Sequence, residues 1–238
     1  MHETFKEYVY NFDINDMNIM KKYYHSLRVE KICDQIARKE NYNDTELELA
    51  KVIGLLHDYG RFLQWTKYHT YKDRDSIDHA DLGVKLLFED NDIFKYYKDI
   101  NKYEIIMNSI KYHNKLDIPS NLSNDNIKFC KLIRDADKLD ILYMFSSKEL
   151  IFIEDGNVTS AVKDSFDNEN LVNLKDQKTE SDNIIKTLAF IYDLNYKTSL
   201  KYLADNKIVE QIYNNINDKD KYCYYFNKII EYINKNTK

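Results

Sequence analysis

The chain has 238 residues, of which 43% are hydrophobic and 32% charged, and its formal net charge is −5. This length can bury a substantial core, and this balance is typical of soluble globular proteins rather than disordered chains. The acidic charge excludes a global field that attracts nucleic acid, and no apolar stretch is long enough to span a bilayer. Three widely separated cysteines predict reduced thiols in a cytoplasm rather than a disulfide framework.

Turn-forming residues are scarce, with one proline and four glycines in the whole chain. A β-rich fold needs many more of them, so we predict an all-α protein. We expect a single domain over residues 1–238, with room for at most a short hairpin at 151–159.

The first predicted helix covers residues 22–38 and carries an apolar stripe at helical spacing, formed by Val29, Ile32, Cys33 and Ile36. His25 lies four residues before Val29, so it faces inward with the stripe. The next apolar run, residues 47–56, ends in His57 and Asp58. Two such groups at the end of an apolar helix must be solvated, paired or bound to metal.

Two further helices present a histidine on their inward face. In residues 80–89, His79 precedes Leu82 and Gly83 by three and four positions, and Ser76 or Asp78 is the expected N-cap. In residues 103–114, His113 shares a face with Ile106 and Ile110. These spacings predict that His79 and His113 also point into the core.

The helix after Asn126 contains two aspartates that the register separates. Asp137 shares a face with Ile133 and Ile141, whereas Asp135 lies beside lysines on what is predicted to be a solvated face. We therefore predict that Asp137 is the buried acid and that Asp135 faces solvent.

All six histidines lie in the first half of the chain. A single inward histidine is more often a hydrogen-bonded core residue than a ligand. Four inward histidines and two inward aspartates on consecutive helices, however, predict a divalent-metal site. Imidazole and carboxylate together suit Fe, Mn, Co, Ni or Zn, and the absence of paired cysteines argues against a structural zinc site.

Three motifs in this order resemble those that define the HD-domain metal-dependent phosphohydrolases: His25-Ser-Leu-Arg-Val, Leu55-Leu-His-Asp-Tyr-Gly-Arg61 and Ile133-Arg-Asp-Ala-Asp-Lys-Leu-Asp140. The resemblance covers roughly residues 20–145 and implies an all-α HD helical bundle as the core. Residues 146–238 then form a C-terminal helical extension, which packs on the core or forms a homo-oligomer surface. By motif matching, the resemblance gives the metal ligands as His25, His57, Asp58 and Asp137.

The segments 78–83 and 111–114 are similar to the extra histidine motifs of two-metal HD proteins, in which the HD aspartate bridges both ions. His79 and His113 would then hold a second ion. The cofactor is thus one or two divalent ions, and the sequence does not distinguish Fe, Mn, Co, Ni, Zn and Mg. The chain lacks the Gly-Tyr-Pro signature and the double histidine of HD-GYP proteins, which argues against cyclic-di-GMP as the substrate.

A metal-activated water attacking a phosphate ester fits this arrangement. Asp58 would orient the nucleophile, and Arg61 would hold phosphate in a bidentate contact. The aromatic and basic loop at 64–74 would close over a small phosphorylated substrate such as a nucleotide, through Gln64, Lys67, His69 and Arg74. Two alternatives stay open: a regulatory module that binds metal and nucleotide without turnover, and a diiron HD oxygenase.

Overall fold

The structure is a computed structural model that describes residues 1–238, and it contains helices and no strand. The all-α prediction is confirmed, and residues 151–159 form no hairpin. None of the helices combines the length and the apolar content that a membrane span requires. The chain divides into two compact units, Met1–Ala136 and Asp137–Lys238.

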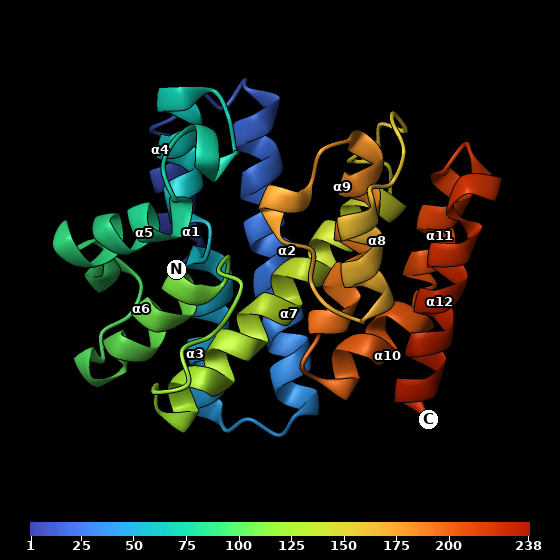
Figure 1. Cartoon of the computed structure of the whole chain (residues 1–238). Helices are drawn as coiled ribbons and strands as arrows, with labels where there is room; N and C mark the ends of the chain where they lie inside the picture. Colours follow the sequence, from blue (N-terminus) through green and yellow to red (C-terminus); the bar gives the residue numbers. More distant parts are fainter. The chain divides into compact units, whose positions relative to one another are not determined.

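The first unit contains the helices that carry the histidines, shown from blue to green in Figure 1. They are α1 (His2–Val9), α2 (Met17–Lys39), α3 (Asp44–Leu56), α4 (Tyr59–Tyr68), α5 (His79–Val84) and α6 (Tyr103–Tyr112). Helix α7 (Asn124–Ser146) begins in this unit and continues into the second. A π-helical turn at Lys85–Glu89 follows α5, and short 3-10 turns lie at Asp73–Asp75, Asp92–Lys95 and Ile100–Lys102.

Helices α2 and α3 form the central pair of the first unit. Asn43 caps α3 in a reciprocal arrangement with Glu46, whose carboxylate accepts from the Asn43 backbone. A Cβ atom at Gly54 would lie 2.8 Å from the Cα of Glu30, so the two backbones approach closely only because residue 54 is glycine. This close approach places the C-terminal end of α3 beside the middle of α2.

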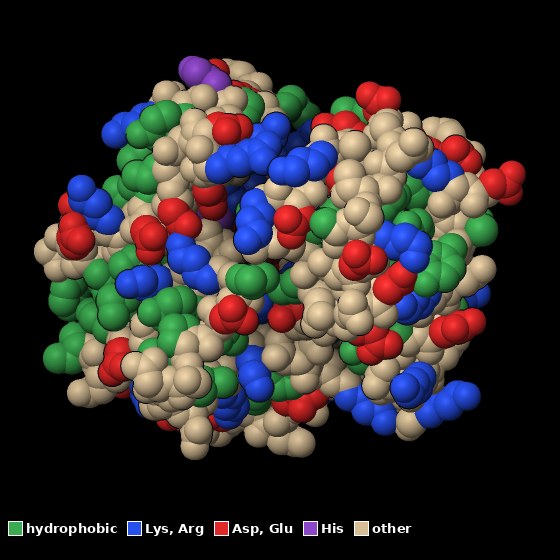
Figure 2. All heavy atoms as spheres, viewed as in Figure 1, with side chains coloured by type: hydrophobic (Ala, Val, Ile, Leu, Met, Phe, Trp, Pro, Cys, Tyr) green, Lys and Arg blue, Asp and Glu red, His purple; other side chains and the backbone are tan.

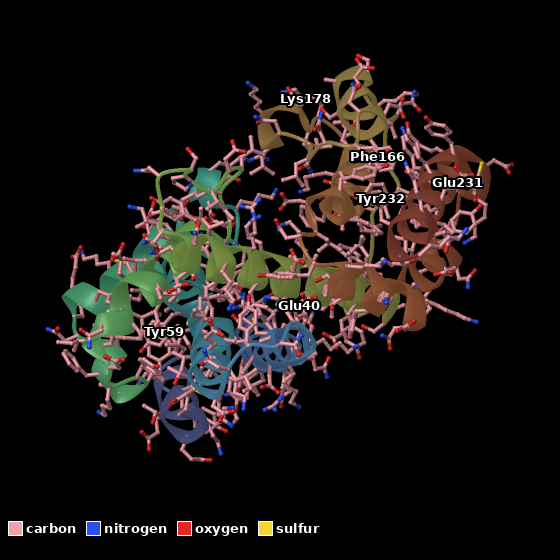
Figure 3. All side chains as sticks on the ribbon, turned by 90° about the horizontal axis from the view of Figure 1, so that it is seen from below. Glu40, Tyr59, Phe166, Lys178, Glu231 and Tyr232 are labelled. Carbon is pink, nitrogen blue, oxygen red and sulfur yellow. The ribbon has the colours of Figure 1, made fainter.

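Aromatic side chains of α1 and α4 fill one side of the first unit. Tyr8 stacks on Tyr59 with ring centroids 3.7 Å apart, and Phe5 meets Phe62 edge-on at 5.8 Å. Figure 3 shows Tyr59 inside the first unit among these side chains. Stacked and edge-on aromatic pairs stabilise a core beyond their area of burial, so this cluster holds the start of α4 in place.

The second unit comprises α8 (Ser160–Asp167), α9 (Glu180–Ala189), α10 (Lys197–Asp205), α11 (Ile208–Asn215) and α12 (Lys219–Thr237). Within it, α12 packs on α9, α10 and α11. Phe166 meets both Tyr192 and Tyr225 with ring centroids 5.2 Å apart, and Tyr192 meets Tyr232 at 4.9 Å. Phe166 and Tyr232 are labelled in the interior of this unit in Figure 3. Its core is thus rich in aromatic rings.

Candidate metal centre

The residues His57 and Asp58 form the turn between α3 and α4. His57 continues the helical backbone of α3, and Asp58 precedes α4 without capping it. Both side chains are buried, at 0% and 2% exposure. Two polar groups are therefore held inside the unit at the end of an apolar helix, where each needs a partner.

A first group consists of His25 on α2 together with His57 and Asp58. The Nε2 atoms of His25 and His57 lie 3.2 Å apart. The Oδ2 atom of Asp58 lies 3.5 Å from the His25 Nε2 and 3.6 Å from the His57 Nε2. One ligand atom from each residue falls within 4.8 Å of the others, which is the spacing of a metal-binding group.

A second group uses the other oxygen of the same carboxylate. The Nε2 atoms of His79 and His113 lie 3.0 Å apart, and the Oδ1 atom of Asp58 lies 3.3 Å and 3.8 Å from them. His79 is the first residue of α5, and His113 immediately follows α6. Asp58 thus directs one oxygen toward each pair of histidines.

Hydrogen bonds at the far side of three rings determine which nitrogen faces the centre. His57 Nδ1 donates to the Gly54 carbonyl at 2.8 Å, and His113 Nδ1 donates to the Ile110 carbonyl at 2.6 Å. His79 Nδ1 donates to the Asp73 carboxylate at 2.8 Å. In the neutral rings, each Nε2 therefore presents a lone pair to the centre.

The pair His79 and His113 gives the strongest indication of a cation. Both Nε2 atoms carry lone pairs when the rings are neutral, yet they face each other at 3.0 Å. A cation between or beside them removes this repulsion, and outer hydrogen bonds of this kind accompany metal-bound histidines. The donor set, imidazole nitrogen with carboxylate oxygen, therefore fits a divalent transition metal.

Two cations flank Asp58. Lys22 Nζ donates to the Oδ2 atom at 2.7 Å, and the Arg61 Nε lies 3.4 Å from the Oδ1 atom. Burial would raise the pKa of Asp58, but the Lys22 ammonium and the hydrogen-bonding histidines outweigh it and hold that pKa well below its usual range. Asp58 is therefore a carboxylate rather than a neutral acid.

Arg61 lies beside the centre and is anchored to the protein through Nη1, while its Nε has no hydrogen-bond partner. Its guanidinium donates to the Gln64 side chain at 2.8 Å, to the Tyr71 carbonyl at 2.6 Å and to Asp73 at 3.0 Å. Gln64 is fully buried, and its amide donates to Asp73, to the Ser76 hydroxyl and to a backbone carbonyl. This geometry shows that Gln64 supports Arg61 and Asp73, and its contact with substrate stays a prediction.

The predicted loop over residues 64–74 is wrong in its first part, because α4 continues to Tyr68. The burial of Tyr59 and Phe62 against α1 stabilises a helix that the aromatic composition alone did not indicate. Lys67, His69 and Arg74 are exposed, and none of them forms a hydrogen bond or ion pair with the residues of the two groups. Their role in binding substrate stays a prediction.

The two aspartates of α7 also differ from expectation. Asp135 is 0% exposed and Asp137 is half-buried, so the prediction that Asp135 faces solvent is wrong. The reason is that every residue from Leu132 to Ala136 is buried, so α7 has no solvated face there and its register cannot separate the two acids. Asp137 is the first residue of the second unit, and its place as the fourth ligand stays a prediction.

Sequence reasoning missed two residues at this centre, Lys22 and Asp73. Lys22 lies three residues before His25 and shares its face of α2, so helical spacing contained a signal for it. Asp73 lies in a turn six residues before His79, where no periodic pattern exists. Asp73 accepts from His79, Arg61 and Gln64, and these partners hold its pKa below the usual range although burial opposes them.

Four of the six histidines, those of the two groups, are buried. In agreement, the face of the molecule drawn in Figure 2 shows histidine in one small patch only. A family model described as HD domain matches residues 23–142, half of the chain. No curated protein and no solved structure matches this chain.

Proposed function

This chain belongs to the HD domain family, and from that premise we propose that it is a metal-dependent phosphohydrolase that cleaves a phosphate ester of a small molecule such as a nucleotide. The observation that carries the proposal is the position of Asp58, whose two oxygens face two separate pairs of buried histidines. One carboxylate between two such groups is suited to bridging two divalent ions.

The proposal gives each group one ion. His25, His57 and Asp58 hold the first, with Asp137 as its fourth ligand, and Asp58, His79 and His113 hold the second. A divalent ion bound there lowers the pKa of a coordinated water and offsets charge on the phosphoryl oxygens. The assignment is supported by the outward hydrogen bonds of the rings, which leave a lone pair on the inner nitrogen of His57, His79 and His113.

The remaining residues orient the metal-binding side chains and balance the charge of Asp58. Asp58 stays ionised because the Lys22 ammonium favours its charged form over the opposing effect of burial, so it can accept a hydrogen bond from a proton-bearing group and hold that group in place. Asp73 holds His79 in one tautomer. Arg61 is fixed by Gln64, Tyr71 and Asp73, so its positive charge stays beside Asp58 during the proposed reaction.

A phosphate-release screen tests this proposal. Purified protein is depleted with a chelator, reloaded in turn with Mn²⁺, Co²⁺, Ni²⁺, Zn²⁺, Fe²⁺ or Mg²⁺, and assayed against nucleotides and sugar phosphates. We expect release in at least one metal-loaded sample, none in the depleted protein and none in Asp58→Asn. Asp125→Asn is the matched control, because Asp125 is exposed at the start of α7, and it should behave as wild type.

Two other outcomes would indicate a different function. Iron-loaded protein that consumes oxygen and releases no phosphate would indicate an oxygenase, to which the imidazole-rich donor set is also suited. Bound metal without turnover of any kind would indicate a regulatory binding module. Full phosphate release by Asp58→Asn would contradict the mechanism itself.

A further inference from the structure

Lys22 is the cation that lies closest to the carboxylate shared by the two groups. Its Nζ donates to the Asp58 Oδ2 at 2.7 Å, and its side chain is 19% exposed, whereas the histidines of the two groups are at most 4% exposed. Lys22 therefore connects the buried centre to solvent. We propose that the Lys22 ammonium is a binding subsite for the phosphate group of the substrate, an inference that rests on the phosphohydrolase activity proposed above.

The unused hydrogen-bond donors of the ammonium support this assignment. Lys22 has three N–H donors, and Asp58 is its single hydrogen-bond acceptor in the structure. Arg61 differs, because its Nη1 donates to Gln64, Tyr71 and Asp73 and so fixes the guanidinium in place, although its Nε has no hydrogen-bond partner. Of the two cations beside Asp58, Lys22 is thus the one that a single acceptor holds, so its ammonium is the freer of the two to turn toward an incoming anion.

Tyr71 limits where the ammonium can move. Its ring centroid lies 5.5 Å from the Lys22 Nζ and 5.7 Å from the Arg61 guanidinium. Its hydroxyl donates to the carbonyl of Asn18 on α2 at 2.9 Å, one turn before Lys22. The ring is therefore fixed to the helix that carries Lys22, and the lysine side chain is confined to the edge of the centre.

Charge explains why the ammonium would exchange its partner. A divalent ion bound to Asp58 would neutralise the negative charge that now attracts Lys22. The ion would also repel the positively charged ammonium. A phosphate dianion arriving at the same place offers several strong acceptors to the ammonium, which binds phosphate as a point charge. The ligand class is accordingly a phosphate monoester or inorganic phosphate, rather than a neutral molecule.

Calorimetric titration of the metal-loaded protein with inorganic phosphate tests the subsite without any turnover. We expect Lys22→Met to weaken phosphate binding by about tenfold to a hundredfold, the usual effect of removing one charged hydrogen bond. Metal content, measured on the same samples, should stay at the wild-type value. Lys22→Arg should bind phosphate more tightly than Lys22→Met, because the positive charge is restored.

Lys21→Met is the matched control. Lys21 is the adjacent residue on α2 and is exposed, and its substitution by methionine removes the same charge. Its phosphate affinity should stay within twofold of wild type. Equal losses in both lysine variants would show a general field effect and overturn the proposal, as would an unchanged affinity in Lys22→Met or a loss of metal from it.

The two proposals fail separately. If no phosphate ester is hydrolysed but Lys22→Met still loses phosphate affinity with its metal intact, the subsite stands and the activity does not. If esters are hydrolysed and Lys22→Met binds phosphate as wild type does, the activity stands and the subsite is refuted.

Discussion

Gly60, in the first turn of α4, determines how closely α5 can approach α4. A Cβ atom at this position would lie 2.2 Å from the carbonyl oxygen of His79 and 2.7 Å from the backbone nitrogen of Gly83. Both obstacles are backbone atoms, so no side chain can rotate away. We expect Gly60→Ala to destabilise the protein and to disturb the second group of ligands, because His79 begins α5.

The size of the effect follows from the geometry. Real Cβ atoms essentially never approach closer than 3.0 Å, so α5 must retreat by about 1 Å. Overpacking of this severity costs about 3 kcal/mol, and the helix propensity of alanine returns about 1 kcal/mol. The free energy of unfolding should therefore fall by about 2 kcal/mol. A shift of about 1 Å also exceeds the tolerance of metal–ligand distances, which is about 0.2 Å.

Urea unfolding and metal analysis of Gly60→Ala measure the two consequences. We expect a lower unfolding midpoint and the loss of the ion held by His79 and His113, with the ion at His25 and His57 retained. Gly83→Ala is the control on the other side of the same contact, where the nearest atom to the new Cβ lies at 3.3 Å, and it should be close to neutral. A Gly60→Ala protein with wild-type stability and metal content would refute the reasoning.

Three further predictions concern other parts of the chain. Asp73→Asn should weaken binding of the second ion by about tenfold to a hundredfold in a chelator-competition titration, because the amide no longer holds His79 in one tautomer; unchanged affinity would contradict this. Under native conditions one thiol, Cys223, should react rapidly with a thiol reagent, since the other two are buried; a second fast thiol would oppose it. Burial raises the pKa of Asp167, but hydrogen bonds from Lys163 and other donors outweigh burial and lower that pKa to about 2. The Asp167 carboxylate therefore stabilises the folded protein above about pH 4, and this contribution is lost toward pH 2. Asp167→Asn should therefore cost about 1 kcal/mol at pH 7, allowing for solvent screening, and progressively less in urea unfolding below pH 4; a pH-independent cost would contradict it.

Helical periodicity was sufficient to predict α2, α3, α6 and α7 and the inward direction of the histidines of the two groups. His25 lies on the buried stripe of α2, and Asp78 caps α5 by accepting from the backbone of Ala80 and Asp81. These features are local, because they depend on residues three or four positions apart and on one capping side chain. The same locality explains why the spacing of His113 placed it on the inner face at the end of α6.

Features that depend on tertiary packing could not be predicted. Asp135 was expected on a solvated face, but α7 is buried on all sides at that point, and a register pattern carries no information about what covers a helix. Residues 64–68 were expected in a loop, but they belong to α4, whose aromatic side chains pack against α1. The partnership of Asp73 with His79 depends on a turn whose path the sequence does not specify.

The number of ions bound per chain tests the central claim most directly. Wild-type protein, Asp58→Asn and Asp125→Asn would be saturated with Mn²⁺ or Zn²⁺, separated from free ion and analysed by mass spectrometry, with thermal melting to confirm folding. Because Asp58 offers one oxygen to each histidine pair, we expect two ions in wild type and in Asp125→Asn, and neither site retained at full affinity in Asp58→Asn. A folded Asp58→Asn protein that binds two ions as tightly as wild type would contradict the account.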